Sequence, residues 1–119
     1  MRVGVILPMG DEVEPGVPRG YGDIRHLATH AEAAGLDSVW VYDHLGDASE
    51  DASASPWEAW TVMSALAEAT SRVRLGQLVL CTAFRSPGVL ARMADTLQDV
   101  SDGRVVLGLG SGWHEPEFR

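Results

Sequence analysis

The chain has 119 residues, 45% hydrophobic and 22% charged, which is typical of a globular domain rather than a disordered segment. Its formal net charge is −8, and all nine basic residues are arginine. An acidic surface repels phosphate backbones, so we expect no nucleic-acid partner. No apolar run approaches the roughly 18 residues of a membrane span, no signal peptide precedes Pro8, and the single Cys81 cannot form an internal disulfide. We therefore expect a cytoplasmic protein without a membrane partner.

The first predicted elements are a strand, a loop and a helix. Residues 3–8 are β-branched and apolar on both faces, as in a buried parallel strand. Residues 10–22 are rich in Gly, Pro and acidic side chains and predict a loop. Apolar residues then recur at helical spacing from Ile24 to Ala34, and Gly35 stands where a C-terminal cap would lie.

The second unit begins with a strand at 37–42, which ends in Asp43 and His44. Small and acidic residues over 46–55 predict a surface loop. Ser55, Pro56 and Glu58 predict a helix start, with Ser55 as the N-cap, and the helical pattern continues to Thr70.

Two more strands and one more helix complete the pattern. A third strand is predicted at 73–80, and Ser86 and Pro87 repeat the helix-start arrangement before a helix that extends to Leu97. Residues 101–103 predict a turn, and a fourth strand follows at 104–109.

The spacing of these elements predicts the fold class. Strands start near residues 3, 38, 73 and 104, so successive units are 35, 35 and 31 residues long. Alternating strands and helices favour a parallel α/β fold, and eight such units in a TIM barrel need about 250 residues. The rival is a doubly wound open sheet, but its dinucleotide-binding glycine motif is absent after the first strand. We therefore predict about half of a (β/α)8 barrel, with four strands and three helices.

Reactive groups of a β/α barrel lie at the carboxyl ends of its strands, which directs attention to two sites. Asp43 and His44 follow the second strand, where a histidine beside a carboxylate could move a proton near neutral pH. The alternative is that Asp43 caps a turn and His44 packs. Gly110 and Gly112 follow the fourth strand, where bare backbone can approach a ligand or simply form a turn.

His26 and His30 have the i, i+4 spacing of two metal ligands on the first helix. No glutamate follows His26 and no third ligand is in view, so a solvated helix face is the favoured interpretation. We predict no metal site.

Four motifs together resemble the N-terminal part of the bacterial luciferase-like, flavin-dependent oxidoreductases. They are residues 34–44 (AGLDSVWVYDH), 70–76 (TSRVRLG), 84–87 (FRSP) and 101–113 (SDGRVVLGLGSGW), and their order and spacing match across essentially the whole chain. The resemblance implies that residues 1–119 are the N-terminal portion of a luciferase-like barrel, incomplete at its C-terminus. It also implies a cofactor at the mouth of the barrel, either FMN or the deazaflavin coenzyme F-420.

The same resemblance implies roles for individual residues. His44 would assist proton transfer beside the cofactor ring, with Asp43 orienting it. A non-proline cis peptide bond would join Leu78 and Val79 behind the ring. The remaining cofactor contacts implied by the resemblance are Gly110, Ser111, Gly112, His114 and Glu117. Sugar-phosphate dehydrogenases of the group carry an acid where this chain has Trp113, which argues against that activity.

Two functions from different classes follow from this resemblance. The first is an oxidoreductase or monooxygenase that transfers hydride or oxygen to or from a small organic substrate, with the chemistry supplied by the cofactor. The second is an inactive half-barrel that acts only as a structural or interaction module. Because half a barrel leaves two open sheet edges, we expect either a homo-oligomer or a dependence on a C-terminal half.

Overall fold

The computed structural model describes the whole chain except residues 11, 15–16, 47–56 and 119. Its main sheet is parallel and has the strand order β1-β4-β5-β7. These strands are β1 (Gly4–Ile6), β4 (Ser38–Val41), β5 (Arg74–Gln77) and β7 (Val105–Val106). The order in space follows the order in the chain, as in a barrel, whereas a doubly wound sheet reverses its order at a switch point. The four predicted strands and the parallel α/β fold are confirmed.

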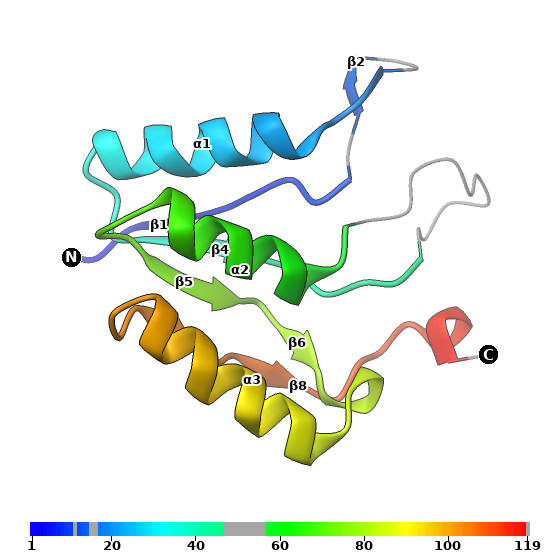
Figure 1. The fold of residues 1–119 in the computed structure, drawn as a ribbon. Coiled ribbons are helices and arrows are strands. Elements are labelled where there is room, and N and C mark those ends of the chain that lie inside the picture. Colours follow the sequence, from blue (N-terminus) through cyan, green and yellow to red (C-terminus); the bar gives the residue numbers. More distant parts are fainter. Residues whose placement is uncertain (11, 15–16, 47–56, 119) are drawn as a thin grey trace.

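Three helices connect these strands, as predicted, and lie side by side over one face of the sheet (Figure 1). They are α1 (Tyr21–Ala33), α2 (Ala59–Ala69) and α3 (Pro87–Val100). The core lies between the two layers, where Val39, Val41 and Leu75 of the sheet pack with apolar residues of all three helices. On the opposite face, the Trp40 indole lies directly over Gly76, where a Cβ would overlap it.

The last two predicted strands are shorter than expected because each is interrupted. The third strand ends at Gln77 and resumes as β6 (Leu80–Cys81), and the fourth resumes as β8 (Leu109–Gly110). β6 and β8 pair in parallel as a separate two-stranded sheet. The bond between Leu78 and Val79, where β5 gives way to β6, is the expected cis peptide. Apolar periodicity could not reveal the interruptions, because Leu78, Val79 and Leu107 within them are themselves apolar.

The loop predicted at 10–22 contains more structure than its composition indicated. Strands β2 (Glu12–Glu14) and β3 (Val17–Pro18) form a small antiparallel pair there, and α1 already begins at Tyr21. Most of the acidic loop predicted at 46–55 lies outside the described residues.

The predicted helix ends are confirmed in two cases and wrong in one. Gly35 follows the last turn of α1 with φ +88°, and the amide of Leu36 donates to the Ala31 carbonyl, as in a Schellman motif. α3 begins at Pro87 with Ser86 as its N-cap. The N-cap of α2 is Glu58, whereas Ser55 and Pro56 lie outside the described residues. The Glu58 carboxylate accepts from the amides of Trp60 and Thr61, as an N-cap side chain does.

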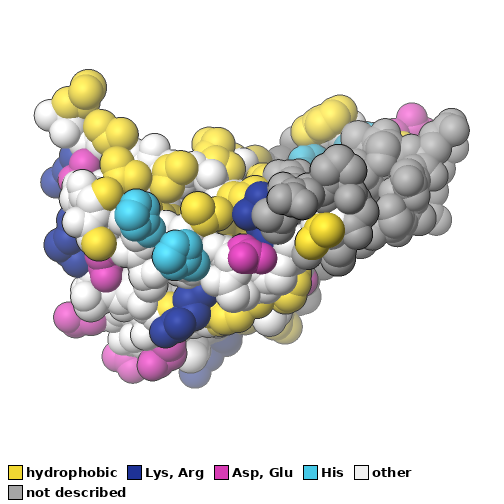
Figure 2. All heavy atoms as spheres, turned by 90° about the horizontal axis from the view of Figure 1, so that it is seen from above, with side chains coloured by type: hydrophobic (Ala, Val, Ile, Leu, Met, Phe, Trp, Pro, Cys, Tyr) yellow, Lys and Arg dark blue, Asp and Glu magenta, His cyan; other side chains and the backbone are white. Residues whose placement is uncertain are grey.

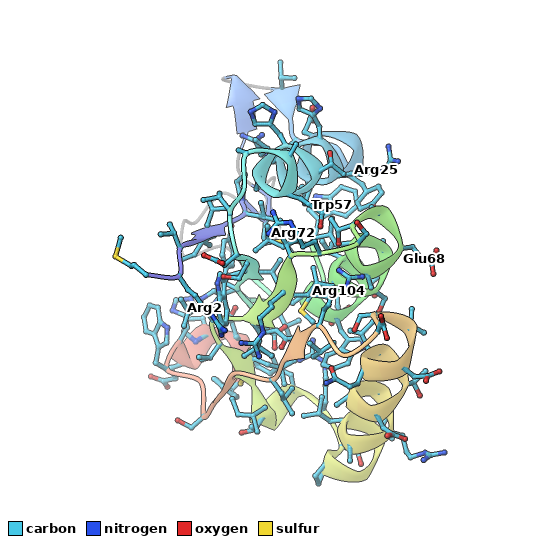
Figure 3. The ribbon with its side chains drawn as sticks, turned by 90° about the vertical axis from the view of Figure 1, so that its left-hand side faces the viewer. Arg2, Arg25, Trp57, Glu68, Arg72 and Arg104 are labelled. Atoms are coloured by element: carbon cyan, nitrogen blue, oxygen red, sulfur yellow. The ribbon has the colours of Figure 1, made fainter. Side chains whose placement is uncertain are left out.

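Charged side chains join the C-terminal ends of α1 and α2 to the segments that lead into β5 and β7. The Glu32 carboxylate at the end of α1 accepts from the backbone amides of Ser71, Arg72 and Val73. The Arg104 guanidinium donates to the carbonyls of Ala67 and Thr70 at the end of α2. Figure 3 shows Arg72 between α1 and α2, and Arg104 between α2 and α3. Among the described residues, no helix has the length and apolar character needed to cross a bilayer.

Candidate active site at the carboxyl ends of the strands

A cleft of about 350 Å³ opens where the strands end. It contains eight of the nine predicted site residues; only His114 is not part of its lining. The lining consists of Tyr42, Asp43, His44, Leu78, Val79, Cys81, Phe84, Gly110, Ser111, Gly112, Trp113 and Glu117. Segments that are far apart in the sequence meet here because parallel strands end at the same edge of the sheet.

Asp43 is buried at this edge, with 5% of its surface exposed. Both of its carboxylate oxygens accept from the Arg85 guanidinium, at 2.6 Å and 2.9 Å, and Oδ2 also accepts from the Cys81 amide at 2.9 Å. Two parallel charge-assisted bonds of this kind hold a carboxylate in a fixed orientation. The described bonds of Asp43 therefore connect it to Arg85 and β6, and none of them reaches His44, which we expected Asp43 to orient.

Arg85 also bonds Glu58, the N-cap of α2, and so connects the cleft to the start of that helix. Desolvation alone would raise the pKa of Glu58, but hydrogen bonds from Thr61, Arg85 and Trp60 lower it to about 2. The bonds to Asp43 raise the pKa of the guanidinium. One cation thus lies between two carboxylates, and the pKa shifts keep Arg85 and Glu58 charged at neutral pH.

His44 follows Asp43 but has a different partner. Its Nδ1 lies 3.1 Å from each carboxylate oxygen of Glu117. The His44 side chain is 33% exposed, whereas that of Glu117 is 4% exposed. The Tyr42 and Trp113 rings each lie with their centroids 6.0 Å from the His44 ring, and the His114 ring lies at 6.5 Å. Glu117 thus holds the His44 ring through Nδ1, three aromatic rings lie near it, and the side chain forms part of the cleft lining.

The remaining wall of the cleft combines apolar side chains with bare backbone. Leu78 and Val79, on either side of the cis peptide bond, are both exposed and line the cleft. A Cβ on Gly110 would lie 2.4 Å from a Val79 methyl group, so only glycine allows β8 to approach Val79 this closely. Gly112 has φ +82°, a conformation that glycine adopts without strain. These glycines are required by packing, whether or not a ligand contacts them.

This arrangement suits a flat, largely apolar ring beside a group that can move a proton. Pockets of this size bind small molecules through apolar walls and a few placed polar groups. Within the described residues, no cluster of three or more His, Cys, Asp or Glu could hold a metal. His26 and His30 stack with their ring centroids 6.1 Å apart on α1.

Sequence reasoning assigned no role to Arg85, although it lies in one of the four motifs. The available signal was its position: a cation just after the third strand must lie at the same sheet edge as the buried Asp43. Phe84 was likewise noted only as a motif residue, and Trp113 only as a motif residue and as the replacement for an acid of the sugar-phosphate dehydrogenases.

Comparisons with known proteins agree with this geometry. The sequence model of the luciferase-like monooxygenase family matches residues 1–119. An F420-dependent glucose-6-phosphate dehydrogenase of Amycolatopsis mediterranei (strain U-32) is 45% identical over 95 residues, which cover 78% of this chain and 28% of that protein. Pyrimidine monooxygenase RutA of Methylobacterium radiotolerans is 33% identical over 131 residues, covering 99% of this chain and 33% of that protein.

A solved structure agrees in fold as well. The coenzyme F420 dependent tetrahydromethanopterin reductase of Methanopyrus kandleri matches with a TM-score of 0.76 and 26% identity, over 98% of this chain and 28% of that one. The chain therefore spans about a third or less of the length of these relatives. Its parallel strands, its cleft at their carboxyl ends and the match over all 119 residues lead to one conclusion: the chain belongs to the luciferase-like monooxygenase family.

Proposed function

We propose that residues 1–119 form the N-terminal portion of the barrel of a flavin- or deazaflavin-dependent oxidoreductase, and that the cleft holds the cofactor ring. The observation that carries this proposal is the composition of the cleft. It combines an exposed apolar surface at Leu78 and Val79, bare backbone at Gly110 and Gly112, and one accessible imidazole at His44. Such a ring needs an apolar wall, close backbone and a nearby proton carrier.

Each part of the cleft has a separate task in this proposal. Leu78 and Val79 support the face of the ring, and the segment from Gly110 to Gly112 contacts its edge. His44 gives a proton to the substrate or takes one from it, while Asp43 is held between Arg85 and the Cys81 amide. The bound cofactor supplies or accepts the hydride. The substrate in this proposal is a small organic molecule. The cellular compartment in this proposal is the cytoplasm.

Our first choice of cofactor is the deazaflavin coenzyme, and FMN is the alternative. Two of the three similar proteins described above are named as F420-dependent. Both coenzymes present a tricyclic ring of similar size, so the cleft itself favours neither. The dehydrogenase relative acts on glucose 6-phosphate. We do not extend that substrate to this chain, because Trp113 stands where the sugar-phosphate enzymes carry an acid.

A second candidate function is a structural or interaction module without catalysis. One observation favours it: the edge strand β1 and helix α1 leave an apolar groove of about 300 Å³ between them, and almost all of its lining is hydrophobic. Seen from above, hydrophobic side chains gather over α1 and this edge of the sheet (Figure 2). A groove of this kind accommodates either another copy of the chain or the remaining barrel units.

Cofactor titration distinguishes the two functions. The purified protein is titrated with the deazaflavin coenzyme and, separately, with FMN, and binding is followed by absorbance and fluorescence. We expect saturable binding of one of them. Val79→Glu, which places a charge against the ring, should weaken binding at least about tenfold. Val89→Glu is the matched control, because Val89 is an exposed valine on α3 outside the cleft. No saturable change with either cofactor would refute the oxidoreductase proposal, and so would an equal effect of both variants.

A further inference from the structure

Glu117 makes contacts that binding a cofactor does not require. Its side chain is 4% exposed, and both carboxylate oxygens lie 3.1 Å from Nδ1 of His44, a residue 73 positions away in the sequence. Oε1 also accepts from the backbone amides of Leu45, at 2.7 Å, and Gly46, at 3.2 Å. The Glu117 carboxylate thus hydrogen-bonds both the His44 imidazole and the two backbone amides that follow it in the sequence.

The hydrogen-bond donors around Glu117 determine its charge. Desolvation alone would raise the pKa of Glu117, but the bonds from Gly46, His44 and Leu45 outweigh it and lower the pKa. The group is therefore an ionised carboxylate at neutral pH. An ionised carboxylate only accepts hydrogen bonds, so the Nδ1 atom that faces it has to carry a proton.

This constraint decides which tautomer the neutral imidazole adopts. A neutral histidine has one protonated nitrogen, so a proton on Nδ1 leaves a lone pair on Nε2. Nε2 lies on the opposite edge of the ring from Glu117, and no hydrogen bond to it is found among the described residues. The His44 side chain is 33% exposed and forms part of the cleft lining.

We propose that Glu117 is a positioning residue that holds His44 as the Nδ1–H tautomer and so makes Nε2 the nitrogen that exchanges a proton with the substrate. The second half of this statement rests on the proposed function. If the substrate were an alcohol, Nε2 of His44 would accept the hydroxyl proton while the carbon–hydrogen bond breaks, and the electron pair of that bond would pass as hydride to the oxidised cofactor. The carbonyl product, the imidazolium and the reduced cofactor would balance the step, and the reverse reaction would return both the hydride and the proton.

Asp43 cannot take this position. Its two oxygens accept from Arg85 and the Cys81 amide, and none of its described bonds reaches His44. The two acids of the site therefore have different tasks: Asp43 is the partner of a buried cation, and Glu117 orients the imidazole. A carboxylate likewise fixes the tautomer of the catalytic histidine in the Ser-His-Asp triad.

The substitution Glu117→Gln tests the proposal with little change in shape. The backbone amides of Leu45 and Gly46 can only donate, so they keep the single oxygen of the glutamine side chain as their acceptor. The NH₂ group of the glutamine then faces Nδ1 of His44. An NH₂ group donates, so Nδ1 becomes the acceptor and the ring proton moves to Nε2. Long-range ¹H–¹⁵N correlation spectra of the purified protein distinguish the two tautomers of neutral His44. We expect Nδ1–H in the wild type and Nε2–H in the variant.

Catalysis supplies the second measurement. With the cofactor bound, kcat of Glu117→Gln should fall at least about 10²-fold, because positioned acid–base catalysis contributes 10² to 10⁴. The matched control is Glu68→Gln, the same exchange at an exposed residue of α2 (Figure 3), which should leave both the tautomer and kcat unchanged.

The outcomes separate this inference from the proposed function. A wild-type His44 with its proton on Nε2 would overturn the inference without any variant. The inference would also fail if Glu117→Gln retained Nδ1–H, or if the tautomer changed while kcat did not. A wild-type protein that binds neither cofactor would refute the proposed function and the catalytic half of the inference. The tautomer result would then still decide the positioning by Glu117, because it needs no cofactor.

Discussion

The buried charge of Asp43 depends on one side chain. Arg85 donates to both carboxylate oxygens, and its own side chain is largely buried. Removing one member of a buried ion pair leaves an uncompensated charge in a poorly solvating environment, which costs far more than the pair contributes. An exposed ion pair at the surface has no such effect.

We therefore expect Arg85→Met to lower the free energy of unfolding by about 3–5 kcal/mol, measured by urea denaturation. Adding Asp43→Asn should restore part of this loss, since a neutral amide is less costly to bury than a charge. Arg92→Met is the control. Arg92 pairs with Asp95 on the surface of α3, and its loss should cost less than about 0.5 kcal/mol. A similar small effect at Arg85 would contradict the assigned role.

Between elements, Glu32 joins the end of α1 to the segment that leads into β5. Desolvation alone would raise the pKa of Glu32, but the bonds from Val73, Arg72 and Ser71 lower it below its ordinary value of 4.5. Because the pKa is lower in the folded protein than in the unfolded chain, this contact stabilises the fold fully above about pH 4.5. The contribution is lost as the pH falls through the folded pKa.

Glu32→Gln should therefore destabilise the protein by about 1–2 kcal/mol at pH 7, because one amide oxygen replaces a carboxylate that serves three backbone donors. The difference between variant and wild type should shrink as the pH falls below 4.5. Chemical denaturation at pH 7 and pH 3.5 measures it, with Glu68→Gln as the control. An equal difference at both pH values would show that the charge of Glu32 does not contribute.

At the scale of the whole molecule, β1 is an edge strand of the main sheet with apolar side chains beside it. The groove beside β1 is apolar, and Ile6 is 52% exposed on this edge strand. An unpaired strand with apolar side chains is a template for pairing with another chain. The relatives are about three times longer than this chain, and further barrel units are expected to cover such an edge.

Residues 1–119 expressed alone should consequently self-associate with rising concentration, measured by light scattering after gel filtration. Ile6→Lys should reduce the association, because a charged side chain on an edge strand opposes pairing. Val89→Lys, at a position 57% exposed on α3, should not. A stable monomer at all concentrations would show that the edge does not drive association.

Much of the fold could be predicted from the sequence because it depends on local patterns. Apolar runs indicated four buried strands, helical spacing indicated three helices, and Gly35 marked the end of the first. The chain order of the strands then brought their carboxyl ends, and with them most of the predicted site residues, to a single edge. The cis peptide bond between Leu78 and Val79 was predicted only through the family resemblance, because an apolar pattern does not reveal the geometry of a peptide bond.

The partners of the charged residues were decided by the tertiary structure alone. Asp43 and His44 are neighbours in the sequence, yet one bonds Arg85, 42 positions away, and the other bonds Glu117, 73 positions away. Asp43 and His44 have different partners because successive side chains along an extended segment point to opposite sides and therefore face different surroundings. The sequence by itself determined which groups reach the edge of the sheet, and only the folded chain determined which of them meet.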